Sequence, residues 1–238
     1  MIDFDRLLHL QGALIWLPCT LLLYAGSSAL HRRFDRAPIA NPTLLTIAAL
    51  TLVLACSGVP YRTYFEAVAI LHYLLGTAVV ALAIPLYRNA RRLRGRWVCM
   101  ALALVAGSLV SIFVGLSVAI LAHASASTVL SLAPKSATAA VAMEISRLIG
   151  GAPAVTATLT IMTGIIGAVG GPYVLNASGI RTPEARGFAM GVASHGIATA
   201  RAFSEGEVAG SFAGLAMVLN AILTALVVPP TVRLLGLV

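Results

Sequence analysis

The stretch PKSATAAVAMEISRLIGG, residues 134–151, places three charged side chains inside a long apolar region. Lys135 is the only lysine of the chain, and Glu144 and Arg147 follow it in the same stretch. On insertion scales, each isolated charge at the centre of a bilayer costs about 2.5–3.5 kcal/mol, and such residues usually serve a function. The stretch therefore indicates a functional element within a membrane protein.

The composition of the whole chain agrees with a membrane protein. The chain has 238 residues, of which 59% are hydrophobic and 10% charged, and its mean hydropathy is +0.96, well above that of a soluble domain. The apolar pattern predicts an all-α polytopic protein of about eight spanning or partly spanning helices, which include two ambiguous segments at 123–149 and 184–204. The clear apolar segments are 8–30, 40–58, 64–87, 97–122, 152–176 and 209–235.

The arginines predict the orientation in the membrane. They gather in two short loops, residues 31–36 and 88–96, and positively charged loops stay in the cytoplasm. We therefore expect a multi-pass membrane protein with both loops in the cytoplasm and its N-terminus on the opposite side of the membrane. The net charge of +8 is explained by orientation, so no nucleic-acid partner is expected.

Charges within or beside the apolar segments occur mainly after residue 122, which divides the chain into two regions. We expect N-terminal scaffold helices over 1–96 and a functional core over 97–238. Matches at an offset of 61 residues, such as Thr138 with Thr199, suggest an internal repeat, although chance also explains matches among common residues. The repeat is parallel if both ambiguous segments cross the membrane, and an inverted repeat requires that one be re-entrant.

The first ambiguous segment is predicted to break at 132–136. Pro134 removes a backbone donor and disfavours helix at the residue before it. The second half of the segment then begins near the bilayer midplane, where its free amides attract anions. Lys135, Ser136 and Thr138 add a cation and two hydroxyls, so together they suit a carboxylate. The alternative is that the lysine reaches an interface and the hydroxyls only cap the helix.

Glu144 and Arg147 lie three residues apart on one helix face, within reach of a salt bridge. Arg147 is close to the end of the helix and is expected at the membrane edge. Glu144 lies deeper, and we expect it to contribute to charge balance or proton coupling.

The second ambiguous segment has its predicted break at Ser194, His195 and Gly196, near its centre. Gly196 permits a turn and a close approach of the backbone to a ligand. His195 is a candidate for binding substrate or carrying a proton, because an unperturbed imidazole titrates near a pH of about 6.5. A lone histidine is also compatible with a satisfied hydrogen-bond donor in a protein core.

Thr199 and Arg201 complete the candidate substrate site in this segment. Arg201 can hold a carboxylate through two hydrogen bonds. It can equally form an ion pair with Glu205, four residues further on. Both interpretations remain open.

Several classes of function lack their sequence signals. Cys19, Cys56 and Cys99 are isolated within apolar segments, so we expect neither a metal site nor a disulfide. We find no phosphate-binding loop and expect no cofactor. The adjacent Ser194 and His195 do not define a hydrolase triad, and we expect no enzymatic activity.

Three motifs together resemble the LrgB/CidB family of bacterial membrane proteins: PKSATAAVAMEISRLIGG, TGIIGAVGGP and ARGFAMGVASHGIATARAFSEGE. The resemblance covers about residues 95–235. It implies a holin-like or antiholin-like regulator of murein hydrolases and cell lysis, acting with a small LrgA/CidA-type membrane partner. It also implies transport of small acids, because a related plastid protein exchanges glycolate for glycerate and bacterial members are linked to pyruvate.

The residues themselves favour transport. A pore has no need of two interrupted helices with anion-binding groups, whereas a carboxylate carrier requires such a site. We therefore predict a transporter, in the form of a homodimer, for glycolate, glycerate, lactate or pyruvate, with a holin-like regulator as the alternative. The predicted substrate-binding residues are Lys135, Ser136, Thr138, Ser194, His195, Gly196, Thr199 and Arg201, with Glu144 and His195 for proton or charge coupling.

Overall fold

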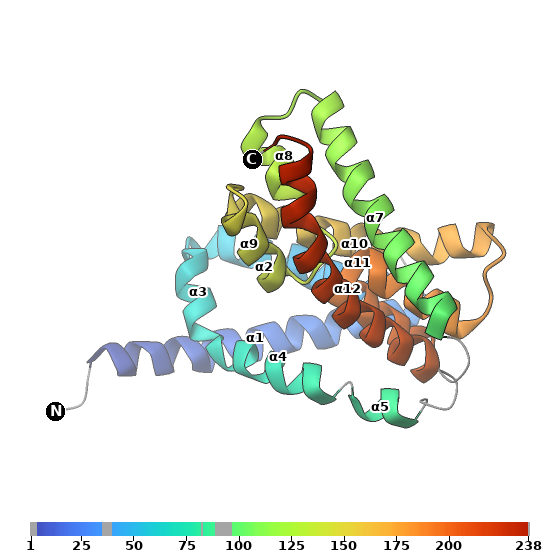
Figure 1. The fold of residues 1–238 in the computed structure, drawn as a ribbon. Coiled ribbons are helices and arrows are strands. Elements are labelled where there is room, and N and C mark those ends of the chain that lie inside the picture. The colour runs from blue at the N-terminus through green and yellow to red at the C-terminus, as the bar shows by residue number, and fades with distance from the viewer. Residues whose placement is uncertain (1–3, 35–39, 82, 89–96, 238) are drawn as a thin grey trace. The chain divides into compact units, whose positions relative to one another are not determined.

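The computed structural model describes residues 4–34, 40–81, 83–88 and 97–237. The chain forms two compact units, Met1–Ala83 and Ile84–Val238. All regular secondary structure in the described residues is helical, which confirms the predicted all-α class (Figure 1). The predicted boundary at 96 and 97 lies inside the second unit, and most of the two arginine-rich loops lies outside the described residues.

The N-terminal unit contains helices α1 to α4 and is held together by contacts of α1. One aromatic contact joins Trp16 of α1 to Tyr64 of α3, whose ring centroids lie 5.8 Å apart. Thr20 of α1 also shares a 3.1 Å hydrogen bond with the Tyr64 hydroxyl. The bounds are Phe4–Arg33 for α1, Pro42–Ser57 for α2, Tyr61–Ala67 for α3 and Ala69–Ala81 for α4. The short α5, Ala83–Arg88, follows in the chain.

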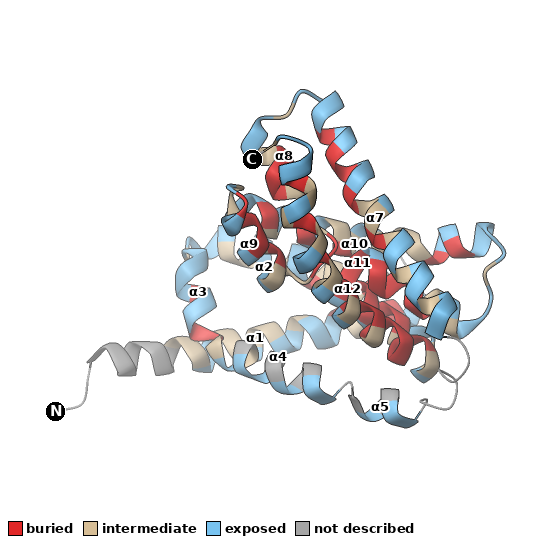
Figure 2. Cartoon of the chain, in the orientation of Figure 1, coloured by how far each residue is buried: buried red, intermediate tan, exposed pale blue. Residues whose placement is uncertain are grey.

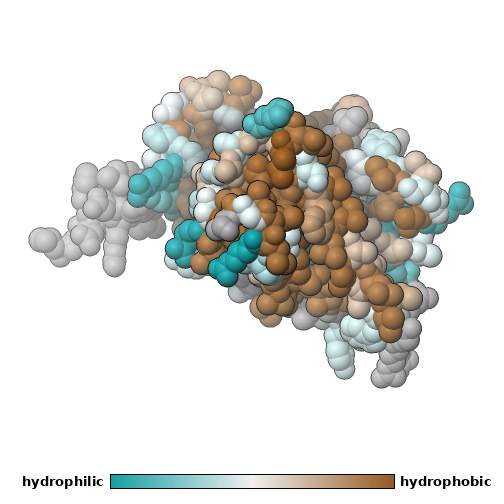
Figure 3. All heavy atoms as spheres, turned by 45° about the horizontal axis from the view of Figure 1, so that its top comes forward, coloured by the Kyte–Doolittle hydropathy of each residue, from teal (hydrophilic) through white to brown (hydrophobic). Residues whose placement is uncertain are grey.

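The C-terminal unit contains the segments that were predicted to carry the function. Its helices are α7 (Trp97–Leu121), α8 (Ala126–Leu132), α9 (Ala139–Leu148), α10 (Pro153–Ala177), α11 (Pro183–Glu205) and α12 (Glu207–Leu234). Figure 2 shows that buried residues gather on the helices of this unit, above all on α11 and α12. Hydrophobic side chains also cover much of the outer face in Figure 3, as expected of a surface that meets lipid.

Four of the described helices are long and apolar enough to cross a membrane. A fifth span results if α2 and α3, which are bent by 118° against each other, count as one. These findings make the protein a multi-pass membrane protein, but they do not confirm the predicted number of about eight. The four helices are Gly12–Arg33 of α1, α7, α10 and α12.

Helices α7 and α12 lie side by side and run in the same direction (Figure 1). Near their beginnings, Met100 packs in the cluster of Phe212, and at mid-length Ser108 hydrogen-bonds to Asn220. We call the end of the unit where both helices begin end A and the opposite end B. Helix α10 runs the other way, because Thr156 in its first turn bonds Ser131 of α8, whereas Asn176 in its last turn bonds Arg186 near end A.

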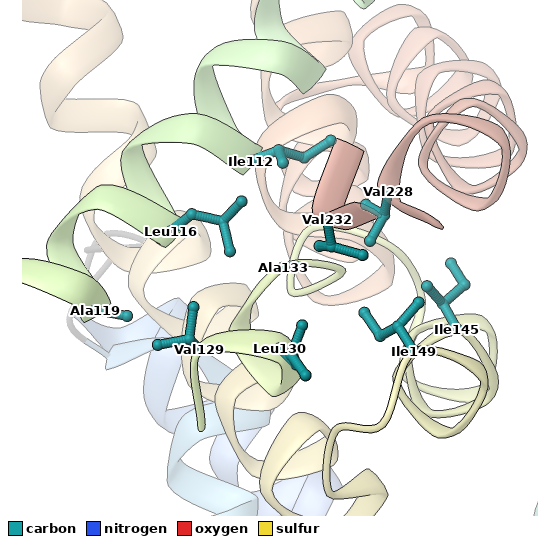
Figure 4. Close-up of a cluster of buried hydrophobic side chains, with 10 residues drawn as sticks. All are labelled: Ile112, Leu116, Ala119, Val129, Leu130, Ala133, Ile145, Ile149, Val228 and Val232. Atoms are coloured by element: carbon teal, nitrogen blue, oxygen red, sulfur yellow. The ribbon is translucent and has the colours of Figure 1, made fainter. Parts of the chain in front are cut away.

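The first interrupted segment folds back on itself. Helix α8 returns from end B along α7, so that Val129 packs with Leu116, and the chain reverses over residues 133–138, which we call the first tip. Helix α9 then leads back toward end B, where Ile149 joins the same cluster (Figure 4). Residues 126–148 are therefore a re-entrant hairpin that enters and leaves at end B.

The second interrupted segment is also a hairpin, because α11 consists of two helical arms that meet at a non-helical turn. The backbone reverses at the second tip, Ser194 and His195, whose φ/ψ values of −144°/26° and 42°/−139° are not helical. The ends of the two arms meet, because Arg186 of the first arm forms a 2.8 Å ion pair with Glu205 of the second. Each arm has about ten residues and a length of about 15 Å, half of a hydrocarbon core.

Both arms of this hairpin pack on α12. Along the first arm, Gly187 approaches the carbonyl of Ala209 and Gly191 that of Ala213, so this arm runs parallel to α12. The second arm runs antiparallel, since Thr199 contacts Met217 and the ring of Phe203 lies over Gly210. The hairpin therefore enters and leaves at end A.

The two hairpins establish an inverted arrangement. The chain contains two similar pairs, each made of a long helix and the hairpin that follows it: α7 with the first hairpin, and α10 with the second. The two pairs point in opposite directions. In each pair, the hairpin enters from the end at which the long helix finishes. Both ambiguous segments are re-entrant, which excludes the parallel repeat. Thr138 and Thr199, paired by the sequence comparison, both lie at the start of the arm that returns from a tip.

Candidate functional site

The two tips meet at mid-height on one side chain, Asn220 of α12. Its amide nitrogen donates to the carbonyl of Ser136 at 3.0 Å and to the carbonyl of Val192 at 3.1 Å. Its amide oxygen accepts from the hydroxyl of Ser108 on α7. Asn220 is fully buried and thus links the first tip, the first arm of α11 and α7. Asn220 is therefore a hydrogen-bonding residue between helices.

Lys135 lies at the first tip and reaches the middle of α7. Its ammonium donates to the hydroxyl of Ser111 at 2.7 Å and to the Ser111 carbonyl at 3.1 Å. The side chain passes close to Gly115, where an added Cβ would lie 3.1 Å from the lysine Cε. The lysine thus lies at mid-height of α7 rather than at an interface, and within the described residues it has no carboxylate partner.

The other two polar residues of the first tip differ in their roles. Ser136 is buried, and its hydroxyl bonds the Ser111 hydroxyl at 2.6 Å, so it belongs to the group around Lys135. Thr138 is the N-cap residue of α9, but its side chain makes no capping hydrogen bond. The alternative that Thr138 only caps the helix is therefore wrong, and its hydroxyl does not occupy the first-turn amides of α9.

The second tip is packed against the middle of α10. Nε2 of His195 lies 2.8 Å from the Thr160 carbonyl, so this nitrogen carries the proton and donates. The imidazole lies over Gly164, and Ser194 contacts Gly167, so small residues of α10 make room for the tip. The Thr160 carbonyl is the partner expected of a buried histidine in a protein core, and the hydrogen bond to it also stabilises the reversal of the chain.

The remaining candidates of α11 lie away from the second tip or serve its structure. The reversal is made by Ser194 and His195, and Gly196, which was expected to permit the turn, has no positive φ. The Thr199 hydroxyl donates to the carbonyl of His195 at 2.8 Å and stabilises the first turn of the second arm. Arg201 is buried in the second arm, and Glu205, one of the two partners considered for it, forms an ion pair with Arg186.

Glu144 and Arg147 form the predicted salt bridge, with Nε of Arg147 3.1 Å from the carboxylate. Both side chains are more than half exposed within the chain, at 57% and 65%. The structure therefore does not bring Glu144 into the group around the two tips.

Sequence reasoning missed several residues that complete the site. Ser108 and Ser111 lie one turn apart in an apolar helix, and this spacing was the available signal. Thr160 is fully buried beside His195, and its hydroxyl has no hydrogen-bond partner in the described structure. No group of His, Cys, Asp and Glu among the described residues is suited to a metal ion.

The two tips that meet at Asn220 define the protein as a membrane protein with two opposed hairpins. Comparison with known proteins gives its family. The LrgB-like family model matches residues 20–234, and the chain belongs to this family. No solved structure matches the chain significantly.

Two named relatives are similar over nearly their whole length. The protein YwbG of Bacillus subtilis, which is uncharacterised, is 36% identical over 88% of this chain and 93% of its own. The holin-like protein CidB of Staphylococcus epidermidis is 30% identical over 95% of this chain and 98% of its own. The predicted family is therefore confirmed. The name of the second relative supports the holin-like alternative more directly than transport.

Proposed function

We propose that the protein is a carrier that moves small monocarboxylates of the glycolate, glycerate, lactate or pyruvate type across the membrane. The observation that carries the proposal is the meeting of two opposed re-entrant hairpins at mid-height, with a lysine at one tip that has no acidic partner among the described residues. In many secondary transporters, inverted repeats carry interrupted helices whose ends form the substrate site near the bilayer midplane. A channel of oligomeric origin has no need of this arrangement.

Three features of the first tip fit a carboxylate. The Lys135 ammonium supplies the charge, and the hydroxyls of Ser111 and Ser136 supply donors beside it. The first turn of α9 adds backbone amides that the Thr138 side chain does not cap. A cation, hydroxyl donors and a helix N-terminus together favour an anion over a neutral solute.

A second candidate function is a holin-like regulator, and the printed name of the staphylococcal relative favours it. In this role the protein would release solutes without selectivity, in a homo-oligomer or with a small membrane partner. Lys135 and its surroundings would then serve folding only. The two candidates differ in whether uptake saturates and in whether it depends on the lysine.

Reconstitution in liposomes distinguishes the two functions. We expect the purified protein to take up labelled pyruvate, lactate, glycolate or glycerate with saturable kinetics, while an enclosed neutral dye is retained. Saturation is expected because a site between two tips binds one substrate at a time. Release of the dye at the same rate as the acids, or no saturable uptake of any of the four, would refute the carrier and favour the holin-like function.

A further inference from the structure

A groove leads from end A to the group around Lys135. It has a volume of about 700 Å³ and lies between α7 and the first arm of α11. Cys99 and Thr182 line it near end A, while Val192 and Ser111 line it at mid-height. Ser111 is the residue whose hydroxyl and carbonyl hold Lys135, so the groove ends at the proposed anion site.

Small side chains line both walls of the groove. On α7, Ala103 and Gly107 follow each other at one-turn spacing, and on the facing arm Ala185 and Ala189 do the same. Small residues at these positions leave space where larger ones would close the helix pair. Most of the lining is apolar, and Glu184 near end A is the only charged residue among the described lining residues.

We infer that this groove is the route by which a monocarboxylate passes between end A and Lys135; the inference rests on the carrier function proposed above. Lys135 lies at the inner end of the route, and its one positive charge attracts one carboxylate. A second carboxylate would have to stay within apolar walls without a counter-ion, which is costly. The groove therefore selects acids with one carboxylate and an uncharged body over dicarboxylates.

The chain contains its own reporter for this route and a matched control. Cys99 is exposed and lines the groove, whereas Cys56 is exposed on α2 in the N-terminal unit. Two variants isolate them: Cys19→Ala with Cys56→Ala leaves Cys99, and Cys19→Ala with Cys99→Ala leaves Cys56. The probe is a negatively charged methanethiosulfonate reagent, applied to the full-length protein in liposomes.

We expect pyruvate to slow the modification of Cys99. At a concentration of about four times its Kd, mass action predicts about fivefold protection. Succinate at the same concentration is expected to give none, and neither acid should protect Cys56. Modification of Cys99 should also lower pyruvate uptake by about fivefold or more, because the attached sulfonate places a fixed negative charge in the route.

A variant tests the route without chemical modification. Ala103→Phe places a ring in the groove, while Ala101→Phe places the same ring on an exposed position that does not line it. Uptake should fall by about tenfold in the first and stay unchanged in the second, since a blocked route affects passage and not folding.

The outcomes separate this inference from the carrier function. Saturable uptake with no protection of Cys99 by any monocarboxylate overturns the route and leaves the carrier intact. Protection of Cys99 without uptake supports the groove as a binding route and refutes the carrier. Absence of both overturns both. If the Ala103→Phe variant does not fold, the protection measured at Cys99 alone tests the route.

Discussion

Replacement of Lys135 by alanine is expected to reduce monocarboxylate uptake at least tenfold while the amount of folded protein stays unchanged. The lysine makes two hydrogen bonds, both to Ser111, and these leave its charge without an acidic partner in the described structure. A hydrogen bond to a charged group contributes about 1.5–3 kcal/mol, which corresponds to about ten- to a hundredfold in affinity. Uptake kinetics in liposomes and size-exclusion profiles measure the two quantities.

The control for Lys135 is the other cation of the same hairpin. Arg147→Ala removes an exposed charge whose partner is Glu144, so uptake should not change. Lys135→Arg should not restore uptake, because the larger guanidinium lacks room beside Gly115. Equal uptake by the wild type and Lys135→Ala would remove the lysine from the substrate site.

Gly191→Ala is expected to destabilise the protein strongly. A Cβ at this position would lie far inside van der Waals contact distance of the carbonyl oxygen of Ala213, and this oxygen belongs to the backbone of α12 and cannot rotate away. Overpacking of this kind costs about 1–3 kcal/mol, which corresponds to a fall in Tm of about 2–12 °C for a chain of this size. Thermal unfolding in detergent, followed by the loss of the monodisperse peak, measures the change.

Gly170→Ala is the matched control on α10. No atom lies within 4 Å of an added Cβ at Gly170, so alanine is tolerated there and gains helix propensity. Equal Tm values for the two variants would contradict the packing of the first arm of α11 on α12.

The helical class, the family and both interruptions could be predicted from the sequence, because they depend on local properties. Hydropathy gives the class, and Pro134 forces a break that the structure places at 133–138. The second break was predicted at Ser194, His195 and Gly196, and the structure places it at the first two of these residues. The reversal uses Ser194 and His195, and it is stabilised by the small residues of α10 that face them.

The re-entrant character of both segments was not predicted, because it depends on contacts between distant residues. The pairing of Arg186 with Glu205 shows that α11 turns back, yet the sequence offered Arg201 as an equally good partner for Glu205. Similarly, the sequence shows Ser111 and Asn220 only as polar residues within apolar helices. Their role follows from the fold, which places the first tip against them. The sequence thus identified the residues of the tips but not the helices that receive them.

Side-specific labelling of four single cysteines tests the opposed hairpins, on which the account depends, most directly. In a protein with its three native cysteines replaced by alanine, Ala122→Cys and Ala154→Cys flank the first hairpin, and Arg181→Cys and Ser204→Cys flank the second. We expect a membrane-impermeant thiol reagent to label the first pair from one side only, the periplasmic side if the loop 88–96 is cytoplasmic, and the second pair from the other side only. Labelling of Ala122→Cys and Ala154→Cys from opposite sides would show that the first segment crosses the membrane, and would contradict the account.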